Sequence, residues 1–266
     1  MLELTLRVSA VEVEDVLDAI LPALPGGAHL RELGAKAELA ILATPGTPGE
    51  EELRRLAGPR LLDLTTAEVS DDWQERRLGR YQPLVVADRF LLRPDWAPGG
   101  DDPGLTEIVL TRSAAFGTGA HPTTQACLAA LAAIPPEGSL ADYGCGSGVL
   151  SIGAARLGWS PVIAVDIDET SLAATEQNAA HNEVKVDARR LDLRSEPPPH
   201  ADAVVVNVPP DVQLDLAAGL ERAPGLVIAS GFTLDDLENV ASAWGAHGLR
   251  VVEEQRVMEW SMLVLR

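Results

Sequence analysis

The chain has 266 residues, enough for one large domain or two modest ones, and its 46% apolar content is that of a folded globular protein. The formal net charge of −19 disfavours a nucleic-acid partner, since phosphates would be repelled, and favours a basic partner. No apolar run reaches the roughly 18 residues of a membrane helix, and the first residues lack the basic start and apolar block of a secretion signal. Two cysteines give neither a disulfide framework nor a metal-ligand spacing. We therefore expect a cytoplasmic protein that binds no membrane and no metal.

Residues 1–67 predict a small α+β unit. The stretch "LELTLRV" alternates apolar and polar residues, which is typical of a half-buried strand. An S-x-x-E capping box at Ser9 and Glu12 then introduces a helix. "AHLRELGAKAELAILA" predicts two short strands that turn at Gly34, "GEEELRRLAG" a helix, and "RLLDL" a last strand. The order β-α-β-β-α-β is that of a ferredoxin-like fold.

The rest of the chain predicts an α/β domain. Residues 68–84, "EVSDDWQERRLGRYQPL", suggest a linker helix, and "APGGDDPG" suggests the tip of a loop. Later strands are expected at "SLADY", "PVIAV", "ADAVVVN" and "GLVIAS", with a further strand that ends before Asp192 in "ARRLDLRS". Helices are expected at 124–134, 148–157, 169–180, 211–221 and 234–246. This alternation predicts a parallel sheet with helices on both faces, whose ligand lies beyond the carboxyl ends of the strands.

A glycine-rich loop follows the first of these strands. "DYGCGSGVL" carries D-x-G-x-G-x-G, formed by Asp142, Gly144, Gly146 and Gly148. Glycines let the backbone turn tightly and approach a ligand, and the free N–H groups of the next helix point toward it. A dinucleotide fingerprint would need a glycine where Val149 stands, which disfavours a pyrophosphate ligand. A tight structural turn is the alternative explanation.

Polar side chains follow the next three strands. Asp166 ends "PVIAVD" and could accept hydrogen bonds from both hydroxyls of a ribose, with Ile167 flat on a purine, or it could cap the following helix. Asp192 could accept from an adenine amino group or be a solvated loop residue. Asn207 could orient an acceptor amine through its amide oxygen, or it could form a turn ahead of two prolines.

Four segments, "FGTGAHPTT", "DYGCGSGVLSI", "VDIDE" and "VVVNV", together resemble the PrmA family of ribosomal protein L11 methyltransferases, which are class I S-adenosylmethionine-dependent enzymes. "DDWQERRLGRYQPL" is similar to the family's linker and "MEWSMLVLR" to its closing strand, with Trp260 at the family's tryptophan. The resemblance implies a Rossmann-like catalytic domain over 85–266, a linker helix over 68–84 and a ferredoxin-like substrate-recognition domain over 1–67.

The resemblance also implies roles for individual residues. Asn207 is the candidate catalytic residue, and the loop that covers the methionine end of the cofactor corresponds to "FGTGAHPTT". The candidate residues for S-adenosylmethionine are Thr124, Gly144, Gly146, Asp166, Asn207, Phe116, Gly117, His121, Thr123, Ile167 and Asp192.

The implied activity is N-methylation of amino groups, on lysine side chains or the N-terminus, of the basic large-subunit protein L11 by a monomeric enzyme. A lysine ammonium, whose pKa is about 10.4 when free, must first lose a proton, and positioning and desolvation would supply most of the rate. The sequence departs from the family's usual pattern at "TRSAA" (111–115), at "VPPD" (208–211) and at Arg77.

Three alternatives stay open. The first is a methyltransferase of the same fold for another amine or amide, because "NVPP" partly resembles the Asn-Pro-Pro-Tyr signature of adenine and glutamine methylation, although the tyrosine is absent. The second is a paralogue that binds the cofactor or the ribosomal protein without transferring a methyl group. The third, nicotinamide binding, is disfavoured by Val149.

Overall fold

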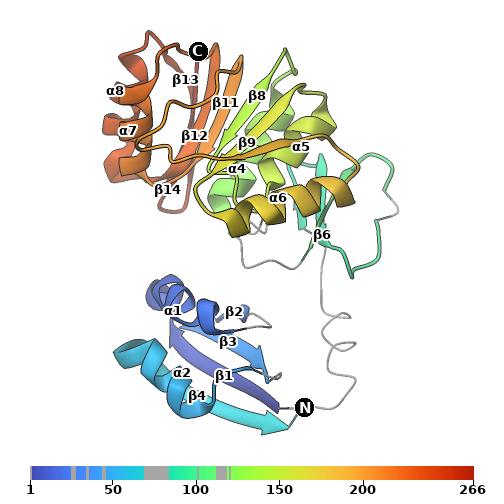
Figure 1. Cartoon of the computed structure of the whole chain (residues 1–266), viewed down its shortest axis with the longest axis vertical. Coiled ribbons are helices and arrows are strands. Elements are labelled where there is room, and N and C mark those ends of the chain that lie inside the picture. The colour runs from blue at the N-terminus through green and yellow to red at the C-terminus, as the bar shows by residue number, and fades with distance from the viewer. Residues whose placement is uncertain are drawn as a thin grey trace. The chain divides into compact units, whose positions relative to one another are not determined.

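The chain forms two compact units, Met1–Tyr81 and Gln82–Arg266 (Figure 1). The structure is a computed structural model that describes residues 2–24, 28–33, 36–43, 46–68, 84–100, 102–111, 119 and 121–266. Glu68 still belongs to a strand of the first unit, and Leu84 begins a strand of the second. The rest of the expected linker helix, including Arg77, lies outside the described residues. No helix in the described part of the chain is long and apolar enough to cross a membrane.

The first unit is an antiparallel sheet with two helices. Its elements are β1 (Leu2–Ser9), α1 (Val13–Ile20), β2 (His29–Leu33), β3 (Lys36–Leu42), α2 (Glu50–Ala57) and β4 (Leu61–Glu68), with 3-10 turns at Ala10–Glu12, Leu21–Ala23 and Gly58–Arg60. The strands pair in the order β2-β3-β1-β4. The predicted ferredoxin-like order of elements is confirmed.

Alternation along β1 builds the core of this unit. Leu4 and Leu6 point inward and pack with Ile20 of α1 and Leu53 of α2. The predicted capping box is wrong in detail, because the side chain of Ser9 makes no cap hydrogen bond. The three residues after it form a separate 3-10 turn, so α1 begins one turn later than the box requires.

The second unit is built on a seven-stranded sheet ordered β10-β9-β8-β11-β12-β14-β13. The strands are β8 (Leu140–Tyr143), β9 (Val162–Asp166), β10 (Asp187–Arg190), β11 (Ala203–Asn207), β12 (Leu226–Thr233), β13 (Val251–Val257) and β14 (Trp260–Leu265). Five strands, β8 to β12, run parallel as predicted. β14 is antiparallel to both β12 and β13, which makes the sheet mixed. The physical reason is the two-residue turn between β13 and β14, since so short a turn can join only antiparallel strands.

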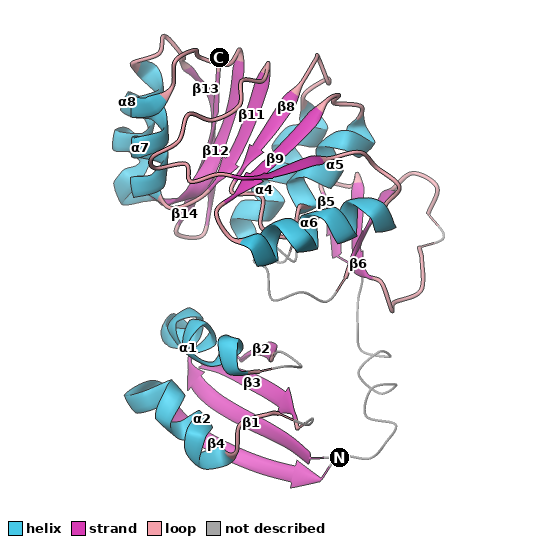
Figure 2. Cartoon of the chain, in the orientation of Figure 1, coloured by secondary structure: helices cyan, strands magenta, loops and turns pink. Residues whose placement is uncertain are grey.

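Helices cover both faces of this sheet (Figure 2). They are α4 (Pro122–Ala133), α5 (Val149–Leu157), α6 (Glu169–His181), α7 (Pro210–Gly219) and α8 (Leu237–Gly245), the last preceded by a 3-10 turn at Leu234–Asp236. One core joins Leu128 of α4 and Ile152 of α5 to Val205 of β11. The other core joins Trp244 of α8 to Val206, the next residue of β11. The predicted α/β fold class is therefore confirmed.

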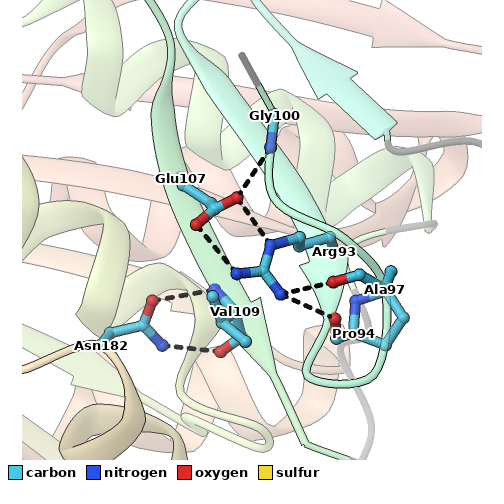
Figure 3. A network of polar contacts seen from close by, with 7 residues as sticks. All are labelled: Arg93, Pro94, Ala97, Gly100, Glu107, Val109 and Asn182. Atoms are coloured by element: carbon cyan, nitrogen blue, oxygen red, sulfur yellow. Dashed lines mark hydrogen bonds and ion pairs between the residues drawn. The ribbon is translucent and has the colours of Figure 1, made fainter. Parts of the chain in front are cut away.

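A second, three-stranded sheet precedes α4. It consists of β5 (Leu84–Val86), β6 (Phe90–Pro94) and β7 (Thr106–Leu110). Arg93 on β6 donates two hydrogen bonds to Glu107 on β7, with Nε–Oε1 at 2.6 Å and Nη2–Oε2 at 3.0 Å (Figure 3). Its third nitrogen, Nη1, donates to the carbonyls of Pro94 and Ala97. This clamp holds the base of the predicted loop 97–104.

Candidate functional site

The glycine loop turns through the left-handed region at three positions. The φ angles are 79° at Gly144, 52° at Gly146 and 79° at Gly148. A Cβ at Gly144 would overlap Val208, and one at Gly148 would lie 2.8 Å from Thr175 Oγ1. Backbone conformation and packing therefore account for the first and third glycines without any ligand, which is the structural alternative considered for this motif.

Asp166 stands at the end of β9 against this loop. Its Oδ2 accepts from the N–H of Gly146 at 2.9 Å, and its Oδ1 accepts from the N–H of Asp168 at 3.0 Å. Asp166 is not the cap of α6: Asp168 is, because its carboxylate accepts from the N–H of Thr170. Two backbone bonds thus fix the Asp166 carboxylate, while each oxygen keeps acceptor capacity for a ligand. The side chain of Ile167 beside it is 54% exposed.

Asp192 is used within its own loop. Its carboxylate accepts from the N–H of Arg194 at 3.0 Å and from Ser195 Oγ at 2.8 Å. These bonds, the one from the Arg194 N–H first, hold the pKa of Asp192 below its ordinary value. The structure gives this residue a loop-stabilising role, and its contact with an adenine stays a prediction.

The start of α4 gathers three of the predicted residues. His121 is the N-cap, and its Nδ1 lies 3.3 Å from the N of Thr123 and 2.7 Å from Thr123 Oγ1. Asn207 Nδ2, at the end of β11, donates to the buried Thr124 Oγ1 at 3.5 Å. The His121 ring meets the edge of Trp260, with ring centroids 5.0 Å apart. The bond from Asn207 uses its amide nitrogen, so it does not compete with the predicted role of the amide oxygen.

The predicted residues therefore fall into two groups at the carboxyl ends of the adjacent strands β9, β8 and β11. One group is the glycine loop with Asp166 and Ile167, and the other is the start of α4 with Asn207. The overlap that a Cβ at Gly144 would make with Val208 shows that the two groups adjoin. Phe116 and Gly117, predicted for the covering loop, lie outside the described residues.

Asp142 is a buried acid that sequence analysis noted only as part of the glycine motif. It is fully buried, and its Oδ2 accepts from the N–H and the Oγ of Ser151 at 3.0 and 2.6 Å. Its Oδ1 has no partner among the described residues. Burial raises the pKa of this carboxyl to about 7, against the opposing effect of the Ser151 bonds.

Two buried asparagines, Asn178 on α6 and Asn182 at its C-cap, were missed entirely. Asn178 Nδ2 donates to the carbonyl of Ser147 in the glycine loop at 2.8 Å, and its Oδ1 accepts from the N–H and Oγ1 of Thr111. One turn later, Asn182 bonds both the N–H and the carbonyl of Val109 on β7, at 2.8 and 2.6 Å (Figure 3). The available signal was a pair of amides four residues apart in a helix, where a buried polar pair needs partners.

The segment after Asn207 is also fixed by a residue that sequence analysis did not single out. The buried Gln213 donates from Nε2 to the carbonyls of Val208 and Ser230, at 3.0 and 2.7 Å. A Cβ at Gly231 would lie 2.6 Å from the carbonyl oxygen of Val208. The departure "VPPD" therefore spans the tightly held turn after β11 and the first two residues of α7.

Comparison with known proteins gives the family. The family described as ribosomal protein L11 methyltransferase (PrmA) matches residues 52–266. The chain is 34% identical over 209 residues to a ribosomal protein L11 methyltransferase of Alkaliphilus metalliredigens and 38% identical over 205 residues to that of Heliobacterium modesticaldum. These matches cover 76% and 74% of this chain, and 66% and 64% of the relatives. The chain thus spans just under two thirds of their length.

A solved structure agrees with these matches. It is the crystal structure of a ribosomal protein L11 methylase from Lactobacillus delbrueckii subsp. bulgaricus, with a TM-score of 0.62 and 26% identity. The similarity covers 70% of this chain and 98% of that one. With the glycine loop, Asp166 and Asn207 placed at one edge of the sheet, the sequence and structural matches lead to one conclusion: the chain belongs to the ribosomal protein L11 methyltransferase (PrmA) family.

Proposed function

We propose that this protein is an S-adenosylmethionine-dependent methyltransferase that N-methylates amino groups of ribosomal protein L11. Membership of the family supports the activity, and the names of the relatives support the substrate. The observation that carries the proposal is the convergence of the glycine loop, Asp166 and Asn207 on three adjacent strand ends. This is the crevice where open α/β sheets bind their ligands.

The residues present suit S-adenosylmethionine. Asp166 offers a fixed carboxylate with spare acceptor capacity for the hydroxyls of the ribose, and the exposed Ile167 offers an apolar surface for the adenine. The hydroxyls of Thr123 and Thr124 and the imidazole of His121 supply polar groups for the methionine end. When bound, the cofactor supplies a methyl group activated on a positively charged sulfur.

The chain's own contribution is to hold and desolvate the acceptor amine. The amide oxygen of Asn207 accepts a hydrogen bond from the neutral amine, while its bond to Thr124 keeps the side chain in place. Removal of the amine from water within the site would lower the pKa of a lysine and favour the neutral, nucleophilic form.

In this proposal, the second unit binds the cofactor and the first unit recognises the substrate protein. The residues assigned to the cofactor all follow the boundary at Gln82, so the first unit is free to recognise the substrate protein. An acidic chain of net charge −19 suits a basic ribosomal partner and disfavours direct contact with nucleic acid. We expect the protein to act as a cytoplasmic monomer.

The test is methyl transfer to purified L11. The full chain is incubated with recombinant L11 and S-adenosylmethionine, and intact-mass and peptide mass spectrometry are used to locate added groups of one methyl each. We expect methylated lysine or N-terminal amines, and Asn207→Ala should lower kcat more than it changes KM, because its bond is needed in the reacting geometry. The matched control is Asn239→Ala, an exposed asparagine on α8. An unchanged L11 mass with the wild type, despite cofactor binding by calorimetry, would support the non-catalytic paralogue.

A further inference from the structure

The turn between β13 and β14 carries an exposed apolar side chain on an unfavourable backbone. Val257 pairs with Trp260, so Met258 and Glu259 form the turn. The φ angle of Met258 is 58°, in the left-handed region that favours glycine, and its side chain is 79% exposed. Glycine would be less strained at this position, and so exposed a thioether buries little apolar area in the described structure. Stability therefore does not explain why methionine stands there.

This turn lies at the edge of the candidate acceptor site. Trp260, two residues after Met258, pairs with Thr233 at the end of β12 and contacts His121. His121 caps α4, whose Thr124 is bonded to Asn207. The turn is thus linked to Asn207, the residue proposed to hold the acceptor amine, through the contact of Trp260 with His121 and the bond between Thr124 and Asn207.

A second exposed apolar residue adjoins the turn. The N–H of Leu234 donates to the carbonyl of Glu259 at 3.3 Å, which fixes the start of the 3-10 turn after β12 beside the hairpin. The side chain of Leu234 is 40% exposed. We call these four residues, Leu234, Asp235, Met258 and Glu259, the hairpin rim.

The charge around the hairpin rim is mostly negative. Segments 231–243 and 257–262 contain the acids Asp235, Asp236, Glu238 and Glu259 and no lysine or arginine. Arg256, the residue just before the second segment, is paired with Glu254 at 2.6 Å. Thr233 Oγ1 donates to Asp236 Oδ2 at 3.1 Å, which orients that carboxylate. An exposed apolar pair bordered mainly by acids complements a basic polypeptide that also carries an apolar side chain. It would repel a nucleic acid, and it is not complementary to a second copy of this acidic chain.

We propose that the hairpin rim docks the backbone segment of the substrate protein that flanks the amine to be methylated. An apolar side chain of the substrate packs on Met258 and Leu234, and basic neighbours face Asp235 and Glu259. This inference rests on the proposed function, because its occupant is the basic protein L11. The rim then selects which amine enters the site, and it acts on KM rather than on the transfer step.

The test replaces Met258 by glycine, which adopts a positive φ angle without strain. Met258→Gly removes the side chain and relieves the backbone, so the variant should fold at least as well as the wild type by thermal melting. With full-length L11 we expect KM to rise about tenfold, while kcat and the Kd for S-adenosylmethionine stay within twofold. The matched control is Glu183→Gly, since Glu183 is an exposed residue at φ 54° just after α6. That control should change the melting temperature in the same direction and leave KM unchanged.

A second variant tests the charge. Asp235→Asn combined with Glu259→Gln should raise KM for L11 and weaken its dependence on salt concentration, because fewer screened charges take part. If the wild type methylates L11 and both variants have an unchanged KM, the docking role of the hairpin rim is overturned and the proposed function is not. A parallel loss of cofactor affinity would make the rim a structural element and would also overturn it. A wild type that transfers no methyl group to L11 overturns both.

Discussion

At the scale of single residues, the site depends on carboxylates that the backbone holds in place. Asp166 and Asp142 lie in the neighbouring strands β9 and β8, yet their environments differ. Asp166 is fixed by two N–H donors and borders the exposed Ile167, whereas Asp142 is fully buried with one oxygen unpartnered among the described residues. We therefore expect Asp166 to contribute to ligand affinity and Asp142 to the pH dependence of stability.

Asp166→Ala should weaken S-adenosylmethionine binding by roughly 1–3 kcal/mol, the range for lost hydrogen bonds to a charged group. Titration calorimetry measures this directly. The control is Asp187→Ala, an exposed carboxylate on the neighbouring β10 that pairs with Arg189. Equal losses in both variants would mean that general surface charge, not the fixed carboxylate, supports binding.

Asp142→Asn should change how stability varies with pH. The folded pKa of about 7 lies above the ordinary value of 3.8, so the folded state binds more protons than the unfolded state between these values. Stability from this group is thus present below about pH 4 and is lost as the pH rises toward 7. The asparagine variant keeps an oxygen that accepts from Ser151, and it has no carboxyl to titrate, so it does not show this loss of stability in this pH range. Urea unfolding at pH 5 and pH 8 should show the variant gaining relative stability at the higher pH, and parallel curves would contradict the assignment.

At the scale of elements, short apolar runs between turn signals in the second half of the chain were predicted as strands, whereas β5, β6, β7 and β13 were not predicted. β8, β9, β11 and β12 begin and end within a few residues of their predicted positions, because each is a short apolar run between turn signals. β13, "VVEEQRV", is mostly exposed, so neither an apolar run nor clean alternation marks it. β13 is a strand because its backbone pairs with that of β14. The residues of β13 alone do not show that this pairing occurs.

The candidate site shows the same division. The positions of Asp166 and Asn207 were predictable because they end apolar strands. The bond between Asn178 and Thr111 was not, since it joins residues 67 apart in the sequence and depends on how α6 packs on β7. Likewise, the close approach of Gly144 to Val208 was not predictable. It arises because β8 and β11 are neighbours in the sheet, and the sequence alone does not show that strand order.

The pairing of α6 with β7 gives a prediction at this scale. Asn182→Ala would leave the N–H and carbonyl of Val109, a residue only 8% exposed, without their side-chain partner. Unsatisfied buried groups cost about 1–3 kcal/mol each, so we expect a loss of roughly 2–4 kcal/mol in the free energy of unfolding. Urea unfolding followed by tryptophan fluorescence measures it. Asn239→Ala, exposed on α8, should change stability by less than about 0.5 kcal/mol.

At the scale of the whole molecule, two units carry separate cores. The first unit buries its own cluster around Leu6 and Leu53, and the candidate site lies wholly in the second. Removal of Met1–Tyr81 should therefore leave S-adenosylmethionine binding nearly intact while abolishing methylation of L11. Calorimetry and mass spectrometry on the truncated and full chains give the two readouts. Full methylation by the truncated chain would make the first unit dispensable for substrate recognition, and loss of cofactor binding would mean that the units depend on each other to fold.

The hairpin at the edge of the seven-stranded sheet bears on the order of folding. β13 and β14 are joined by two residues and can pair with each other in microseconds. Thr233 of β12 and Trp260 of β14 are 27 residues apart, whereas the paired Leu140 of β8 and Ala203 of β11 are 63 apart, so we expect β14 to join β12 before β8 joins β11. The contact of Trp260 with His121 joins residues 139 apart, and we expect it to form later still. During refolding, the β13 and β14 amides should accordingly be protected from hydrogen exchange no later than the β8 and β11 amides, and transfer activity should return last.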